Sequence, residues 1–259
     1  MNTENLASHA QFLSIHSYRG GTGKSNITAN LGVILAGKGL NIGLVDMDIQ
    51  SPGIHALFGF DSSSFNYCLN DYLWSRCAIK DAVHDLAGRL DQPVPGQLKL
   101  LPSSIHPGDI ARIIHDGYDV DRLNSGLEDF AEAFGLDYVL MDTHPGLGEE
   151  TLLSLALSDC LLILLRPDRQ DYQGTSVTMK VAAQLSVPRI SMCINKSPPM
   201  LPEDSLRRKV EEAYGFPLDA VLYHCDEMMN LGSDGLFVQR YPEHAFTRTM
   251  KALAEKLSS

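Results

Sequence analysis

The residues whose types and spacing most clearly indicate a chemical role form one run, Arg19 to Ser25, which reads R-G-G-T-G-K-S. Its glycines allow the backbone to turn so that successive N–H groups point at phosphate oxygens. The Lys24 ammonium can reach the terminal phosphates of a nucleotide, and the Ser25 hydroxyl can ligate Mg²⁺. Tyr18 stands where the general pattern of such loops has its first glycine. The run therefore predicts a phosphate-binding loop with a modified start.

Three aspartates follow apolar runs that are typical of buried strands. Asp46 and Asp48 close one run, and Asp142 closes another, V-L-M-D. Side chains alternate along a strand, so Asp46 and Asp48 are expected to point the same way. Each aspartate alone could be a helix cap or turn former. In a chain with a phosphate-binding loop, they predict a Mg²⁺ site made by Ser25, Asp46 and Asp142.

Short apolar runs alternate with segments of helical period, which predicts an α/β fold. We expect one domain over residues 12–259, after a flexible leader over residues 1–11. Its sheet should be mostly parallel and twisted, with about seven or eight strands and helices on both faces. Since α/β sheets bind ligands at the carboxyl ends of their strands, the loop and the aspartates should meet there. The predicted strands are Phe12–Tyr18, Asn41–Asp48, Leu98–Pro102, Tyr138–Thr143, Cys160–Arg166, Arg189–Asn195 and Ala220–Cys225.

The composition excludes several classes of protein. The 259 residues are 44% hydrophobic, which is enough for a core without disulfides or a structural metal. The net charge of -11 argues against a surface that binds nucleic acid or anionic lipid over its whole extent. The five cysteines form no CxxC pair and lack the spacing of a zinc site. With no signal peptide and no apolar stretch of about 20 residues, we expect a cytoplasmic protein.

Together these residues resemble the deviant Walker A ATPases of the ParA and MinD family over nearly the whole chain. The resemblance implies a single-domain P-loop NTPase that binds ATP or ADP with Mg²⁺ and forms an ATP-dependent homodimer. The family loop begins with a lysine that reaches the phosphates bound by the other subunit, and Arg19 occupies that position here. Arginine is always charged and can bind phosphate in a bidentate manner. Either Arg19 supplies this charge, or Arg166 or Arg169 does.

The resemblance also implies roles for the other residues. Asp48 would orient or activate the attacking water and would act in catalysis with Lys24 and Arg19. Asp46 and Asp142 would support the Mg²⁺ shell, and the turn after Asp142 would be the second switch segment. The implied nucleotide-binding set is Gly20, Gly21, Thr22, Gly23, Lys24, Ser25, Asn26 and Asn195.

The choice of base depends on the run from Cys193 to Pro198. It begins like the guanine-reading motif N-K-x-D, but Pro198 stands where that motif needs aspartate. GTP is therefore disfavoured, and the resemblance makes Asn195 a candidate to hydrogen-bond adenine. A second interpretation is that Asn195 ends its strand by capping a turn before two prolines.

Two segments could bring the protein to a surface. The apolar residues of Ala245–Leu257 follow an i, i+4, i+7, i+11 pattern, which favours a last helix packed on the core over a membrane anchor. The cluster Arg207–Lys209 could contact nonspecific DNA. Because Glu211 and Glu212 follow directly, a solvated helix face with paired charges is the stronger interpretation.

These observations predict an ATPase that converts ATP and water to ADP and phosphate, slowly without an activating partner protein. ATP-dependent dimerisation would then position or partition a cellular cargo. The alternative is a nucleotide-binding regulatory module with little turnover, which the replacement of the signature lysine by Arg19 favours.

Overall fold

The computed structural model describes residues 9–61 and 64–259. Its strands are β1 (Gln11–His16), β2 (Ile42–Met47), β3 (His84–Asp85), β4 (Leu98–Leu101), β5 (Tyr138–Thr143), β6 (Cys160–Leu165), β7 (Arg189–Ser197) and β8 (Ala220–Tyr223). The first helices are α1 (Lys24–Gly37), α2 (Ile54–Leu57), α3 (Leu69–Leu73), α4 (Pro107–Asp116), α5 (Val120–Phe134) and α6 (Glu149–Ala156). The others are α7 (Arg169–Gln184), α8 (Glu203–Tyr214), α9 (Asp226–Leu231), α10 (Phe237–Arg240) and α11 (Ala245–Leu257), with short 3-10 turns at Ile79–Ala82 and Ala87–Arg89.

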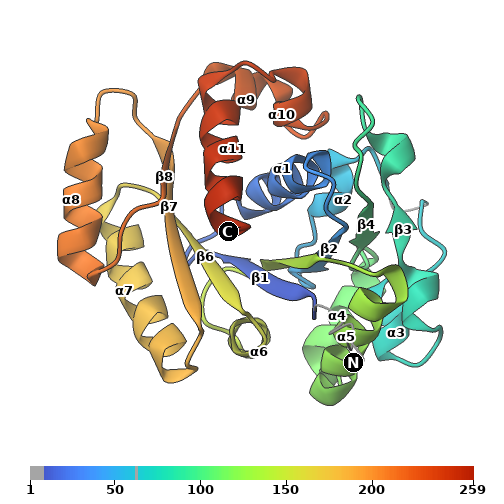
Figure 1. The fold of residues 1–259 in the computed structure, drawn as a ribbon. Coiled ribbons are helices and arrows are strands. Elements are labelled where there is room, and N and C mark those ends of the chain that lie inside the picture. The colour runs from blue at the N-terminus through green and yellow to red at the C-terminus, as the bar shows by residue number, and fades with distance from the viewer. Residues whose placement is uncertain (1–8, 62–63) are drawn as a thin grey trace, which may run out of the picture.

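The strands form one eight-stranded sheet in the order β3-β4-β2-β5-β1-β6-β7-β8 (Figure 1). All pairs are parallel except β3 with β4. The prediction of a mostly parallel α/β sheet is confirmed. Residues 1–8 of the expected leader lie outside the described residues, and β1 already begins at Gln11.

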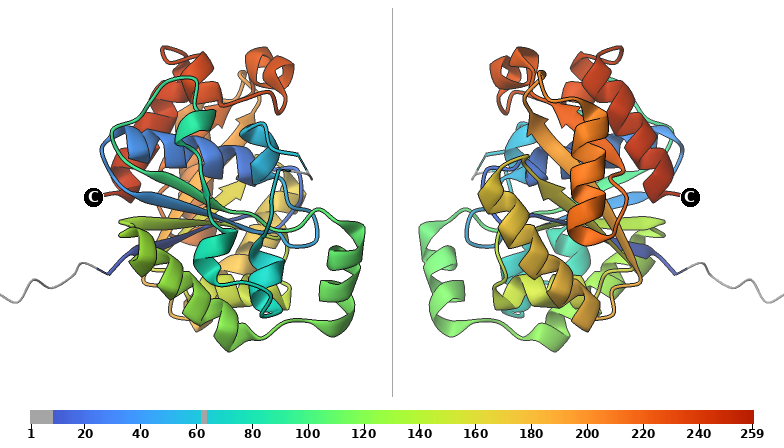
Figure 2. Two further views of the ribbon diagram at one scale, coloured as in Figure 1. Left: turned by 90° about the vertical axis from the view of Figure 1, so that its right-hand side faces the viewer. Right: turned by 90° about the vertical axis from the view of Figure 1, so that its left-hand side faces the viewer.

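Helices cover both faces of the sheet, as the side views show (Figure 2). Leu140 of β5 packs in the cluster with α1, α10 and α11, while Val139 and Met141 pack in the cluster with α3 and α5. This alternation follows from the pleat, which turns successive side chains to opposite faces. Buried on both faces, the central strands are continuous apolar runs such as C-L-L-I-L-L in β6.

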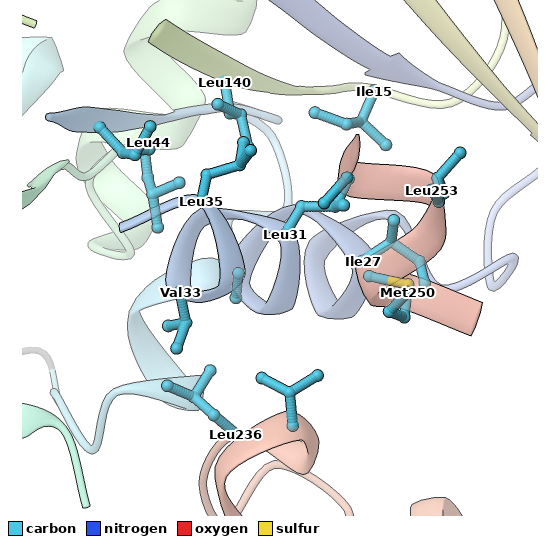
Figure 3. Close-up of a cluster of buried hydrophobic side chains, with 14 of the residues drawn as sticks. Ile15, Ile27, Leu31, Val33, Leu35, Leu44, Leu140, Leu236, Met250 and Leu253 are labelled. Carbon is cyan, nitrogen blue, oxygen red and sulfur yellow. The ribbon is translucent and has the colours of Figure 1, made fainter. Parts of the chain in front are cut away.

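Helix α1 lies between the sheet and the C-terminal helices (Figure 3). Leu35 faces Leu44 and Leu140 of the sheet, whereas Val33 on the other side of the helix faces Leu236. Each such side chain contributes roughly 1.5–3 kcal/mol when fully buried. The start of α1 is thereby held firmly at the carboxyl edge of β1.

The last helix packs on this core as its apolar pattern predicts. Phe246, Met250, Leu253 and Leu257 of α11 are all buried against α1 and β8. Within the described residues, the helices are all too short or too polar to span a bilayer.

Candidate functional site

The loop between β1 and α1 has the backbone geometry of a phosphate cradle. Gly21 and Gly23 have φ angles of 75° and 95°, which favour glycine. Gly23 is the N-cap of α1, so the amides of the helix start face the loop. The Thr22 hydroxyl donates to Ser17 Oγ at 2.7 Å, and the Ser17 hydroxyl donates to the Arg19 carbonyl at 2.8 Å. These internal bonds brace the conformation of the loop.

Asp46 and Asp142 lie side by side at the carboxyl edge, where they are register partners on β2 and β5. Asp46 Oδ2 accepts hydrogen bonds from the Gly53 and Ile54 amides at 2.8 and 3.1 Å. Both oxygens of Asp142 are buried and have no partner at normal hydrogen-bonding distance among the described residues, although the nearby Ser25 hydroxyl favours the charged carboxyl. A buried carboxylate without donors is costly unless a cation or proton compensates it.

Burial therefore raises the pKa of both carboxyls. The pKa of Asp142 rises to about 7, although the Lys24 ammonium opposes the rise. The pKa of Asp46 is also raised, by burial and then by the charge of Asp142, against the two amides that it accepts from. A divalent cation would relieve both costs, so the orphaned oxygens of Asp142 fit the predicted Mg²⁺ site.

Ser25 is the third oxygen donor predicted for that site. A Cβ added at Gly53, in the turn that Asp46 holds, would lie 3.6 Å from Ser25 Oγ. The turn after β2 and the start of α1 are therefore in contact. Lys24 beside them is 7% exposed, and its charge acts on the pKa of Asp142. Hydroxyl and carboxylate oxygens are the donors that Mg²⁺ prefers.

Asp48 is held by a residue that sequence reasoning missed. Its Oδ1 lies 2.6 Å from His144 Nδ1, in the turn after β5, and also accepts from the Ser51 amide at 3.2 Å. The Asp48 side chain is 13% exposed and that of His144 is 28% exposed, so water can reach the pair. The available signal was the position of His144, two residues after Asp142 at a strand end.

Arg19 is not free in the single chain. Its Nη1 lies 3.4 Å from Asp168 Oδ1 and 3.3 Å from Asp171 Oδ1, at the start of α7. Asp171 Oδ2 also accepts from the backbone amide and Nε of Arg166, at 2.8 and 3.2 Å. Arg19 and Arg166, two of the three arginines that could supply the trans charge, therefore both bind Asp171.

Asn195 braces the phosphate loop. Its Nδ2 donates to the Thr22 carbonyl at 2.8 Å, and its Oδ1 accepts from the Lys196 amide at 2.9 Å. Lys196 Nζ donates to the Gly21 carbonyl at 2.8 Å. Both the Nδ2 and the Oδ1 of Asn195 thus form hydrogen bonds within the protein. Its contact with adenine stays a prediction.

A cavity of about 470 Å³ opens directly beside this brace. Gly23, Asn26 and Asn195 form its wall toward the phosphate loop, and the rest of the lining includes side chains from β8, α9 and α11. The lining is largely apolar, with Tyr223 and Met228 among its members. A mostly apolar pocket of this size, adjacent to a phosphate cradle, suits a nucleoside.

The cationic cluster on α8 is engaged within its own surroundings. Arg207 forms an ion pair with Glu203, and Lys209 Nζ lies 4.4 Å from the centre of the Tyr172 ring. These contacts favour the interpretation of a solvated helix face over that of a DNA contact.

Comparisons with known proteins agree with this geometry. An AAA domain model matches residues 10–189. The flagellum site-determining protein YlxH of Helicobacter pylori is 30% identical over 167 residues, which cover 62% of this chain and 49% of that protein. The sporulation initiation inhibitor protein Soj of Bacillus subtilis is 26% identical over 64% of this chain and 62% of its own. The chain thus spans about half to two thirds of the length of the curated relatives it matches.

Solved structures share the fold over nearly the whole chain. The septum site-determining protein MinD of Pyrococcus horikoshii, solved with Mg-ADP, superposes with a TM-score of 0.80 at 21% identity. The match covers 96% of each chain. With the family model and the phosphate-loop geometry, these comparisons show that the chain belongs to the ParA/MinD family of P-loop ATPases.

Proposed function

We propose that this protein binds ATP with Mg²⁺ and hydrolyses it to ADP and phosphate within an ATP-dependent homodimer. The observation that carries the proposal is the orphaned carboxylate of Asp142 beside Lys24 at the open phosphate loop. The solved relative bound to Mg-ADP supports the same ligand set. The cavity next to Asn26 and Asn195 would take the nucleoside, with Asn195 as the candidate contact of adenine.

The residues of the chain then have separate roles. The loop amides and Lys24 bind the phosphates, and Ser25, Asp46 and Asp142 hold the cation, which neutralises phosphate charge when bound. Asp48 orients the attacking water and accepts its proton. His144, 2.6 Å away, fixes the direction of the Asp48 carboxylate. Arg19 reaches the phosphates bound by the partner subunit and stabilises the charge of the transition state.

The biological output that we propose is positioning or partitioning of a cargo, timed by hydrolysis that a partner protein stimulates. The relatives include a flagellum site-determining protein, a septum site-determining protein and the structure of a MinC:MinD complex. The low-turnover regulatory module is retained as a second candidate, because the Arg19 guanidinium is already paired with Asp168 and Asp171 in the single chain.

The test is ATP turnover and nucleotide binding of Asp48→Asn. We expect turnover to fall about 10²-fold or more, since a positioned general base typically contributes that much. ATP affinity should change little. Asp129→Asn, on the exposed face of α5, is the matched control. Equal turnover of Asp48→Asn and the parent would contradict the catalytic role, and intrinsically negligible turnover with tight ATP binding would favour the regulatory module.

A further inference from the structure

Three side chains with metal-binding atoms converge outside the phosphate site. Cys225 ends the turn after β8, Glu227 is in the first turn of α9, and His244 is the N-cap of α11. Their ligand atoms all lie within 4.8 Å of one another, and His244 Nε2 is 3.9 Å from Glu227 Oε2. The Glu227 and His244 side chains are 48% and 28% exposed, so solvent can enter.

The donor set has a definite chemical preference. A thiolate, an imidazole and a carboxylate are the three protein ligands that zinc accepts, with a fourth position left for water. The sulfur donor disfavours Mg²⁺ and Ca²⁺, which bind oxygen ligands. The site is thus chemically different from the oxygen donor set of Ser25, Asp46 and Asp142.

We propose that Cys225, Glu227 and His244 form a binding site for one zinc-class divalent cation, at the rim of the cavity beside the phosphate loop. The cation would tie the turn after β8 to the start of α11, two segments that lie together in the fold (Figure 1). Cys225 also lines the cavity, so the cation would lie at its wall. The inference does not depend on ATP hydrolysis.

Two proton positions must change when the cation binds. Burial, with the charges of Glu227 and Asp226, raises the pKa of the Cys225 thiol, so its proton is released to solvent on binding. His244 Nδ1 accepts from the Phe246 amide at 3.1 Å, so in the neutral ring the proton is on Nε2. Ligation through Nε2 moves this proton to Nδ1 and ends the cap of α11 by that side chain.

The experiment uses the full chain, freed of metal and nucleotide, and titrates it with Zn²⁺ by calorimetry and with Co²⁺ by absorbance. We expect one Zn²⁺ to bind per chain, and its binding should require Cys225, Glu227 and His244. With Co²⁺ we expect a thiolate-to-metal charge-transfer band. Cys225→Ser should abolish that band and weaken Zn²⁺ binding by about 10–100-fold or more, because loss of even an outer partner of a ligand has that effect.

His244→Asn is the second variant, because asparagine can still accept from the Phe246 amide while it removes the imidazole. It should weaken Zn²⁺ binding to the same degree as Cys225→Ser and retain the parent melting temperature of the metal-free protein. Cys77→Ser and His115→Asn are the matched controls and should bind Zn²⁺ like the parent. Absence of the charge-transfer band in the parent, or unchanged Zn²⁺ binding in both cluster variants, would overturn the proposal.

Discussion

At the scale of single residues, His16 gives the fold a specific sensitivity to acid. The ring is fully buried at the end of β1, and its Nδ1 is 2.9 Å from Thr143 Oγ1. Burial, helped by the charge of Lys24, lowers the pKa of His16 to about 3. In the unfolded chain His16 has a pKa near 6.5 and takes up a proton that it does not bind in the folded chain. The free energy of unfolding therefore decreases as the pH drops from 6.5 toward 3.

His16→Asn removes this titration and keeps a polar group near Thr143. Between pH 7 and pH 5 the free energy of unfolding should decrease by about 2 kcal/mol less in His16→Asn than in the parent. Urea titrations at the two pH values measure the difference. Because Asp46 and Asp142 titrate in both proteins, their contributions cancel in the comparison. The same pH dependence in parent and variant would show that His16 is not held neutral by burial.

Arg19 is paired within the single chain, so its proposed role across a dimer requires it to leave these partners. The side chains of Arg19 and Asp168 are 37% and 43% exposed, and exposed ion pairs contribute only about 0.2–1 kcal/mol. Asp171 stays bonded to Arg166 when Arg19 leaves, so no buried charge is left unpaired. The proposed release of Arg19 toward a partner subunit would therefore cost little.

We expect Arg19→Ala to lower ATP turnover on the order of 10³-fold, the effect of removing a cation that stabilises the transferred phosphate. Arg19→Lys, which restores the family residue, should retain most of the turnover. The comparison includes Arg166→Ala and Arg169→Ala, measured by phosphate release at saturating ATP. If Arg19→Ala keeps its turnover while one of these two loses it, the trans charge belongs to that residue.

At the scale of elements, the connection before β4 shows how closely the chain is fitted to α1. The Gly96 amide donates to the Ala36 carbonyl at 2.9 Å, and a Cβ added at Gly96 would lie 2.0 Å from the Leu40 carbonyl oxygen. Both contacts are with backbone, which cannot move aside like the end of a side chain. A Cβ added at Gly88, in the same connection, meets nothing within 4 Å.

Gly96→Ala should therefore lower the free energy of unfolding by about 1–3 kcal/mol, as overpacking does. Gly88→Ala is the matched control and should stay within about 0.5 kcal/mol of the parent. Chemical unfolding of the parent and the two variants measures these differences in the free energy of unfolding. Equal stability would mean that the connection before β4 shifts freely.

Most elements could be predicted because their signals are local. The predicted strand Tyr138–Thr143 has the bounds of β5, and the other six predicted strands differ from the observed ones by a few residues at their ends. The strand predicted from Phe12 ran on to Tyr18, whereas β1 ends at His16 and Ser17 belongs to the phosphate loop. The two-residue β3 had no signal, since its antiparallel pairing with β4 is a tertiary contact.

The candidate site was predictable only in part for the same reason. The phosphate loop and its aspartates have motif spacing, but the contact of His144 with Asp48 joins residues 96 positions apart. The anchoring of Arg19 by Asp168 depends on how α7 packs next to the loop. The cysteine spacing gives no sign of the proposed zinc site, because Cys225 and His244 meet only through the packing of α11 against β8.

At the scale of the whole molecule, the strand order explains why the candidate site residues gather at the carboxyl ends of the central strands. Strand β5 lies between β1 and β2, so Asp142 is flanked by the phosphate loop on one side and by Asp46 on the other. All three strands are parallel, and their carboxyl ends therefore open on one surface. Arg19 lies in the same loop but is directed to α7, away from the oxygen donors. In the proposed dimer, a second copy of the chain would cover that surface.

The most direct test of this account is the molar mass of the protein in solution, measured by light scattering behind a sizing column. Samples with ADP, with ATP, and with ATP on Asp48→Ala are compared at one protein concentration. We predict a monomer with ADP and a dimer with ATP that persists in Asp48→Ala, because that variant binds ATP without hydrolysing it. A mass that nucleotide does not change, in the parent and in Asp48→Ala alike, would contradict the nucleotide-dependent dimer.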